Sequence, residues 1–315
     1  MKALFFTALR GLKITENLGG GEKFGETLKI TNDRTKIESL LNKSIKEQIG
    51  ILETNELLSG GPVFFSNSDA PSDMSSQQFL AFKVYEIQLF QLGCWLYKDN
   101  AINTEMSYVV SESNGSNKID SNFIGLKYLN SIGKQVDLHV NRDELKEIRN
   151  FCNAAFGQKI DLTNTKTKLS QDSQRLPRAL YFIGAARAQN DLSLKITNYC
   201  TAFETLFSTS QAELAHQLSE RISFFLASDS DERIVIYRKI KEAYGLRSKV
   251  VHGNTIPNST INKLDEVTLA CDHFARELIK LVMTNQICVE LFRLNQKDFE
   301  EELVRLVLSG THLQH

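Results

Sequence analysis

The apolar pattern of this chain changes character at about Arg175. From there onward, apolar residues recur every three or four positions through several successive segments, which are separated by short polar connections. That spacing is typical of amphipathic helices, and short connections favour antiparallel neighbours packed as a bundle. We therefore expect the C-terminal part of the chain to be entirely helical.

Each helix of this bundle is predicted from its own run of apolar residues. The runs lie at 176–186, 192–207, 214–225, 234–244, 264–288 and 297–308. Asn258, Ser259 and Thr260 stand before the longest run, and their side-chain oxygens can cap a first helical turn. We expect one long helix to begin at this cluster and to reach Cys288.

The first part of the chain has a mixed pattern. Short runs with β-branched, aromatic or alternating residues predict strands, and longer periodic runs predict helices. The expected strands are 4–9, 26–31, 62–66 and 105–110, and the expected helices are 77–97 and 143–156, with Asn141 as a possible N-cap of the second. Segment 35–51 is either a short helix or a segment flanked by strands, and polar segment 111–117 is expected to be a turn.

This mixture predicts an α+β domain followed by an all-α helical bundle. Segment 159–174 is polar and has no apolar period, so we expect a linker there. The predicted domains are 1–170, with a sensing or substrate-selecting role, and 171–315, the helical domain.

Composition limits the classes of partner. The chain has 315 residues, of which 37 are basic and 38 acidic, with a net charge of −1. No global field attracts it to nucleic acid, so any RNA binding needs a local basic patch, one that two subunits can share.

The cysteines and the N-terminus bear on location. The five cysteines have no metal-ligand spacing, so we expect neither a metal site nor a disulfide framework, but small core residues in a reducing cytoplasm. The N-terminal sequence lacks a signal-peptide pattern, and no apolar stretch is long enough to span a membrane. We expect a cytoplasmic protein without a membrane partner or a cofactor.

The run 243–253, AYGLRSKVVHG, combines an arginine and a histidine near a predicted helix end. His252 follows Arg247 by five positions. On a regular helix, with about 100° per residue, their side chains would lie about 140° apart around the helix axis. Gly253 can supply the left-handed residue that ends a helix, which places His252 at the terminus. Histidine can move a proton of the RNA 2′-OH or of a leaving oxygen, and arginine can stabilise a phosphate. The alternative is a capping histidine beside a surface arginine.

This stretch resembles the motif of the HEPN superfamily, an Arg followed after a few residues by a His at a helix end, and in particular its Apea-like branch. Segments 199–208 and 213–225 are similar to the middle helices of that family, so the resemblance covers about 192–291. It implies a bundle that dimerises through the C-terminal domain, with both Arg–His motifs facing one cleft. It also implies endoribonuclease activity in antiviral or toxin systems.

Other residues support the motif or its RNA contact. Glu204 matches the acidic position of the family's second helix and can orient Arg247 or His252; otherwise it is a solvated glutamate. Ser248 follows Arg247, where the family often has Asn, Asp or His, and can exchange one hydrogen bond. Basic residues of the fourth predicted helix can form a strip with Arg247 that binds RNA phosphates; the residues that we expect to contact RNA are Arg238, Lys241 and Lys249. The alternative is a charged surface helix without a binding role.

Two functions follow. The first is a homodimeric, metal-independent endoribonuclease, a defence or toxin-like effector whose N-terminal domain responds to a trigger ligand or protein. The second is a non-catalytic module that dimerises or binds RNA or a partner protein. If both Arg247 and both His252 line one open cleft of a dimer, the first is favoured, whereas a buried His252 bonded to its own helix favours the second.

Overall fold

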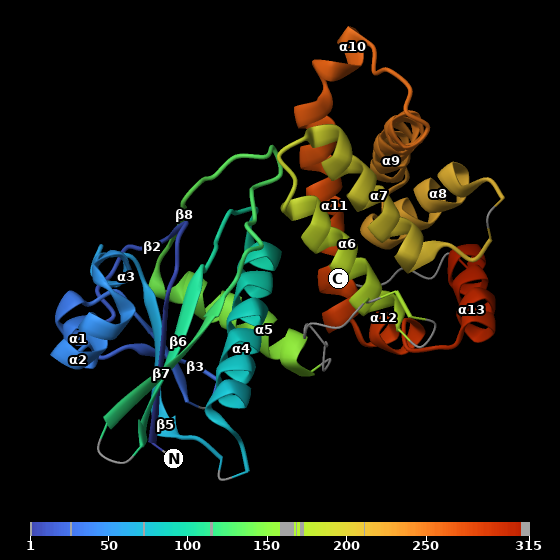
Figure 1. Cartoon of the computed structure of the whole chain (residues 1–315). Helices are drawn as coiled ribbons and strands as arrows, with labels where there is room; N and C mark the ends of the chain where they lie inside the picture. The colour runs from blue at the N-terminus through green and yellow to red at the C-terminus, as the bar shows by residue number, and fades with distance from the viewer. Residues whose placement is uncertain are drawn as a thin grey trace. The chain divides into compact units, whose positions relative to one another are not determined.

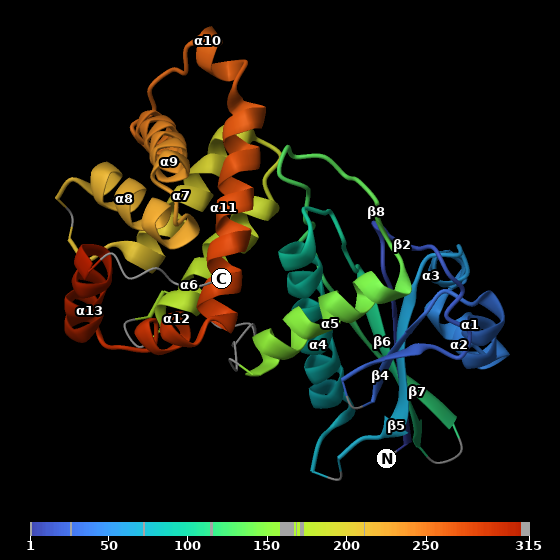
Figure 2. The same ribbon diagram turned by 180° about the vertical axis from the view of Figure 1, so that it is seen from behind.

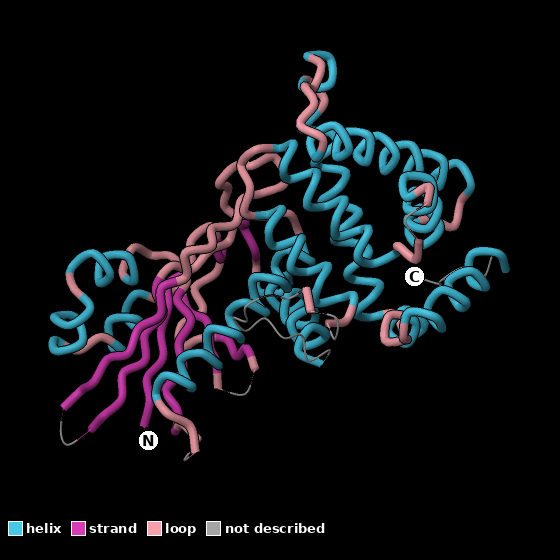
Figure 3. Tube along the Cα trace, turned by 45° about the vertical axis from the view of Figure 1, so that its right-hand side comes forward, coloured by secondary structure: helices cyan, strands magenta, loops and turns pink. Residues whose placement is uncertain are grey.

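The computed structural model describes residues 2–25, 27–71, 73–113, 116–157, 167, 169–170, 173–210 and 212–309. The chain divides into two compact units, Met1–Lys127 with Gln135–Phe156, and Tyr128–Lys134 with Gly157–His315. The described strands belong to the first unit, and the second is helical (Figures 1 and 3). An α+β part thus precedes a helical part, as predicted. Most of the expected linker at 159–174 lies outside the described residues.

The first unit is built on an antiparallel sheet with strand order β3-β4-β5-β1-β6-β7, and β2 and β8 form a separate parallel pair. The strands are β1 (Lys2–Ala8), β2 (Leu12–Ile14), β3 (Glu22–Phe24), β4 (Leu28–Thr31), β5 (Val63–Asp69), β6 (Met106–Ser113), β7 (Ser116–Phe123) and β8 (Leu138–Val140). Its helices are α1 (Arg34–Leu40), α2 (Lys43–Ile49), α3 (Ile51–Leu57), α4 (Ser76–Tyr97) and α5 (Arg142–Gly157).

Both faces of this sheet are covered, because side chains alternate between the faces along each strand. Phe5 and Phe64 pack on one face with residues of α4 and α5, the two helices seen together in Figure 2. Phe6 and Phe65 point to the other face, where they pack with α1, α2 and α3. Two apolar layers therefore hold the sheet between the helices.

The predicted helices of this unit are confirmed as α4 and α5. The Asn141 side chain accepts hydrogen bonds from the backbone N–H groups of Asp143 and Glu144, both at 2.9 Å, so it caps α5 as expected. Segment 35–51 forms α1, α2 and the first residue of α3, and these helices lie between strands β4 and β5.

The predicted turn at 111–117 is wrong in extent. Residues 111–113 extend β6, and β7 begins at Ser116. β7 lies at the sheet edge, and among the described strands it pairs with β6 alone. An edge strand tolerates polar side chains on much of its length, so β7 lacks the apolar alternation on which the strand predictions depended.

The helical unit is arranged around α7, which packs against α6, α8, α9 and α11. Its buried Tyr199 donates a hydrogen bond to Asp272 of α11 at 2.7 Å. The helices are α6 (Arg175–Arg187), α7 (Leu192–Phe207), α8 (Leu214–Leu226), α9 (Ser230–Val251), α10 (Asn258–Ile261), α11 (Leu264–Thr284), α12 (Gln286–Leu291) and α13 (Gln296–Ser309).

Buried arginines satisfy the C-terminal carbonyl groups of α7. Arg175 Nη1 donates to the carbonyl oxygens of Thr205, Leu206 and Ser208, each at 3.1 Å. Arg221 Nη1 donates to that of Phe207. The last carbonyls of a helix lack partners within the helix and carry partial negative charge, so the two guanidinium groups stabilise this end of α7.

The single long helix predicted from 258 to 288 is wrong. The chain forms α10, α11 and α12 there, and the α11 helix ends at Thr284. Asn285 has an extended backbone, and its side chain accepts from Cys288 N–H at 3.2 Å, which begins α12. An asparagine cap at this point ends one helix and starts the next, although the apolar period continues across it.

Candidate active site

Helix α9 ends in a cap that fixes the backbone of His252. The N–H of Gly253 donates to the carbonyl of Val250 at 3.0 Å, and that of Asn254 donates to Lys249 at 2.9 Å. With Gly253 at φ +69°, these two bonds form a Schellman cap. The predicted left-handed glycine is confirmed, and His252 is the C-cap residue directly before it.

The Arg247 guanidinium faces α7, where it forms an ion pair with Glu204. Its Nη2 lies 3.2 Å from Glu204 Oε1 and donates to Oε2 at 3.4 Å. The two side chains are 23% and 19% exposed, so the pair is largely withdrawn from water. Arg247 Nε is buried and has no hydrogen-bond partner among the described residues. Glu204 thus orients the guanidinium through Nη2, and the side chain keeps a partly exposed surface that an anion can approach.

Tyr244 completes this cluster, and the sequence interpretation missed it. The guanidinium carbon of Arg247 lies 5.4 Å from the centre of the Tyr244 ring. The available signal was the spacing of three helical positions, which brings two side chains onto one face. Burial, followed by the charge of Glu204, raises the pKa of the Tyr244 hydroxyl. Burial also raises the pKa of Cys200 well above its usual value. Both neighbours therefore stay neutral at pH 7.

His252 is exposed, and its ring has no hydrogen bond or ion pair with the described residues. Its backbone angles, φ −86° and ψ 5°, leave it close to the helical path, about 140° around the helix from Arg247. The half-buried Ser248 accepts the His252 backbone N–H at 3.2 Å through its carbonyl. The fold thus joins Glu204 to Arg247, and it leaves His252 free and directed elsewhere.

The basic residues of α9 lie on its outer side. Arg238 and Lys241 are exposed and Lys249 is half-buried. Viewed down the helix axis, these three side chains and that of His252 leave α9 within a sector of about 80°. The Arg247 side chain leaves on the opposite side, about 180° from Arg238. The expected basic strip therefore does not include Arg247, because that side chain turns inward to Glu204.

The described residues contain no group of three His, Cys, Asp or Glu side chains placed to hold a metal ion. Among the same residues, every helix is too short or too polar to cross a membrane. Comparison with known proteins found no matching family model, no matching curated protein and no matching solved structure.

Proposed function

We propose that the helical unit is a metal-independent endoribonuclease, acting as a homodimer in antiviral defence or as a toxin-like effector. The observation that carries the proposal is the Arg247–Glu204 pair, which holds a partly exposed guanidinium in place on the helix that presents His252 to solvent at its end. The resemblance to the Apea-like HEPN motif that the sequence of segment 192–291 suggested is the second ground for proposing this activity.

The proposed reaction uses the 2′-OH of the RNA as nucleophile. His252 removes the 2′ proton or protonates the leaving 5′ oxygen, a role suited to a group whose usual pKa lies near neutrality. The 2′ oxygen bonds to phosphorus as the bond to the 5′ oxygen breaks, which yields a 2′,3′-cyclic phosphate and a 5′-hydroxyl. Arg247 stabilises the negative charge that develops on the phosphate, and Glu204 holds it in place. Arg238, Lys241 and Lys249 bind neighbouring phosphates.

The divergence of the two side chains favours a site shared between copies. Within one copy, the side chains of Arg247 and His252 leave α9 about 140° apart around its axis. At that angle the two side chains cannot both contact one phosphate from the same side of the helix. In a twofold dimer, His252 of one copy can approach Arg247 of the other. The helical unit is therefore proposed to form the dimer interface.

A second candidate is the non-catalytic module that dimerises or binds RNA or a partner protein. The inward direction of Arg247 favours it, because an arginine neutralised by Glu204 can also serve only to hold α9 against α7. The exposure of His252 favours the enzyme instead, since a purely structural C-cap histidine would bond to its own helix end.

Cleavage by the purified full-length chain separates the two. A single-stranded RNA is incubated with wild type, His252→Ala and Arg247→Ala, with and without EDTA. Matched controls are His139→Ala, an exposed histidine of β8, and Arg305→Ala, whose side chain is 74% exposed. The His252 variant should lose about 10²- to 10⁴-fold in rate, and the Arg247 variant about 10²- to 10³-fold.

The products identify the mechanism. Mass spectrometry should find 2′,3′-cyclic phosphate ends, DNA should resist, and EDTA should have no effect. If the wild type cleaves no RNA under any trigger tested, or if all variants cleave equally, the non-catalytic binding module is favoured instead.

A further inference from the structure

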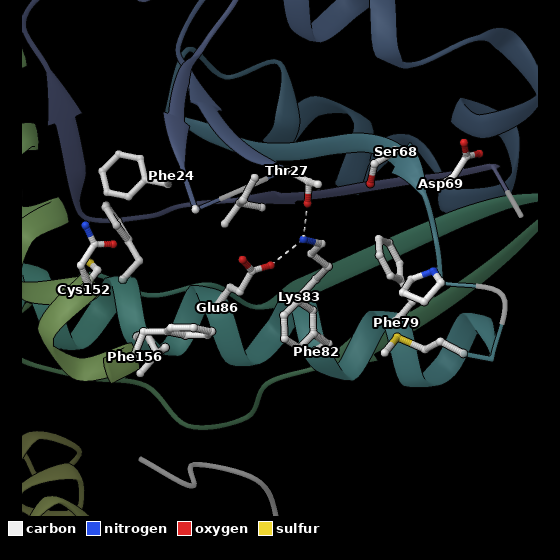
Figure 4. A pocket seen from close by; sticks show the side chains of 17 residues that line it. Phe24, Thr27, Ser68, Asp69, Phe79, Phe82, Lys83, Glu86, Cys152 and Phe156 are labelled. Carbon is white, nitrogen blue, oxygen red and sulfur yellow. Dashed lines mark hydrogen bonds and ion pairs between the residues drawn. The ribbon is translucent and has the colours of Figure 1, made fainter. Parts of the chain in front are cut away.

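The first unit contains a cavity of about 510 Å³ beside α4. Its walls are mainly aromatic and aliphatic, and they come from the β3–β4 hairpin, the end of β5, α4 and α5 (Figure 4). The volume is in the range of sites for small molecules, which bind in mainly apolar pockets with a few polar groups. The aromatic lining residues are Phe24, Phe79, Phe82, Phe90 and Phe156.

A polar pair stands inside this apolar wall. Lys83 Nζ donates to Thr27 Oγ1 at 2.7 Å and lies 2.5 Å from Glu86 Oε2 (Figure 4). The Lys83 side chain is 2% exposed and that of Glu86 is 15% exposed. The ammonium also lies 5.4 Å from the ring centre of Phe79 and 5.3 Å from that of Phe82. Burial of a lysine among phenylalanines costs stability unless the charge is paired, and here Glu86 and Thr27 supply the partners.

The pair still has capacity for hydrogen bonds toward the cavity. An ammonium has three N–H donors, and Lys83 uses two of them on the described residues. Glu86 Oε1 accepts no hydrogen bond from the described residues, whereas Oε2 binds Lys83. One donor and one acceptor are therefore available side by side.

Charge selects among ligands that fit. The charged lining residues that the structure describes are Lys83, Glu86 and Asp69, one cation and two carboxylates. The lysine is already neutralised by Glu86, so a phosphate or carboxylate would meet uncompensated negative charge. A flat neutral ligand avoids that repulsion and can stack on the phenylalanine rings.

We propose that this cavity binds a neutral heteroaromatic ligand of the purine base or nucleoside class, with a ring acceptor on Lys83 and the adjacent N–H donor on Glu86. The ring lies between Phe79, Phe82 and Phe156, and the site excludes phosphorylated forms. This inference does not depend on RNA cleavage by the helical unit.

Calorimetric titration of the full-length chain tests the site with adenosine and guanosine as probes, and with AMP and decanoate as anionic competitors. At least one nucleoside should bind, and AMP and decanoate should bind at least 10-fold more weakly. Phe82→Ala, at a ring that is 40% exposed, should weaken nucleoside binding about 10-fold, close to the loss of one stacking contact. Phe123→Ala, at an exposed ring of β7 outside the cavity, should leave it unchanged.

Glu86→Gln adds a test of the polar recognition, because it keeps the shape of the side chain but exchanges the carboxylate for an amide. It should weaken nucleoside binding and bring AMP closer to adenosine in affinity. Tighter binding of decanoate or AMP than of either nucleoside by the wild type would overturn the proposal. So would the absence of nucleoside binding at millimolar concentration, or binding that Phe82→Ala leaves intact.

Discussion

The two units each bury a cation against a carboxylate beside aromatic rings, but they do so for different ends. Lys83 and Glu86 belong to one helix and are 2% and 15% exposed, whereas Arg247 and Glu204 join two helices and are 23% and 19% exposed. The first pair is compensated inside an apolar cavity, which suits a neutral ligand. The second leaves its guanidinium partly exposed to water, which suits an anion. The degree of withdrawal from water, rather than the kinds of group, separates the two.

The largest stability effect is expected at the more deeply buried pair. Lys83→Met leaves the Glu86 carboxylate without its partner in an apolar wall, which should cost about 3 kcal/mol. Local hydrogen exchange of α4 measures the loss without assuming that both units unfold together. Lys118→Met, at a side chain that is 64% exposed, should change exchange little. Equal protection of the α4 amides from exchange in the Lys83 and Lys118 variants would show that burial does not make the Lys83–Glu86 pair more important for stability than an exposed pair.

A smaller effect is expected at the interhelical pair. Glu204→Gln replaces the charged acceptor of Arg247, and it should cost about 1.5 kcal/mol, as for one hydrogen bond to a charged group. Exchange should rise in α7 and α9, and RNA cleavage should fall because Arg247 loses its orientation. Glu302→Gln, whose partner Arg305 is 3.8 Å away and exposed, is the matched control. A loss of stability as large as that of Lys83→Met would contradict the view that the two pairs differ because they differ in burial.

The end of α9 gives a pair of substitutions with opposite signs. A methyl group at Gly253 or Gly245 meets no atom within 4 Å, so backbone conformation alone decides the outcome. Gly253→Ala places a side chain at φ +69° and should cost about 1 kcal/mol. Gly245→Ala, inside the helix, should gain about 1 kcal/mol. Thermal unfolding that moves in the same direction for both would contradict the Schellman cap at His252.

The smallest effects are expected at the cysteines beside each pair. Burial raises the pKa of Cys152, which lines the cavity, to about 12, and that of Cys200 well above its usual value. A raised folded-state pKa keeps the thiol protonated, so reaction of folded Cys152 with iodoacetamide should keep increasing with pH from 9 toward 12. Adenosine should slow alkylation of Cys152 and leave Cys200 unchanged. Rapid alkylation of both at pH 8 would contradict the raised pKa of these two thiols.

Sequence periodicity predicted the α+β and helical parts because burial of one helix face or one sheet face leaves a regular record. It failed at β7, a polar edge strand, and at Asn285, where a cap interrupts an apolar period. The resemblance to the HEPN motif singled out Arg247 and His252 as candidates, and Gly253 predicted the cap at the helix end. The sequence offered Glu204 as a partner of Arg247 or of His252, or as a solvated residue, and could not decide among these because the choice depends on the packing of α7 against α9.

The cavity of the first unit could not be predicted from the spacing of apolar residues, for a related reason. Lys83 occurs in a long apolar helix, where a lysine can equally mark an exposed position. Its burial follows from the β3–β4 hairpin, which brings Thr27 to its ammonium through contacts distant in sequence. Such contacts leave no regular spacing in the chain.

The central claim, that Arg247 of one copy acts with His252 of another in RNA cleavage, is tested most directly by mixing two inactive variants. Arg247→Ala and His252→Ala chains are unfolded together, refolded as a mixture and assayed on RNA, with each variant refolded alone as control. Mixed dimers contain one intact site of two, so the mixture should recover about a quarter of wild-type activity by random pairing in twofold dimers. A mixture as inactive as each variant alone, with mixed dimers verified by mass spectrometry, would contradict the shared site.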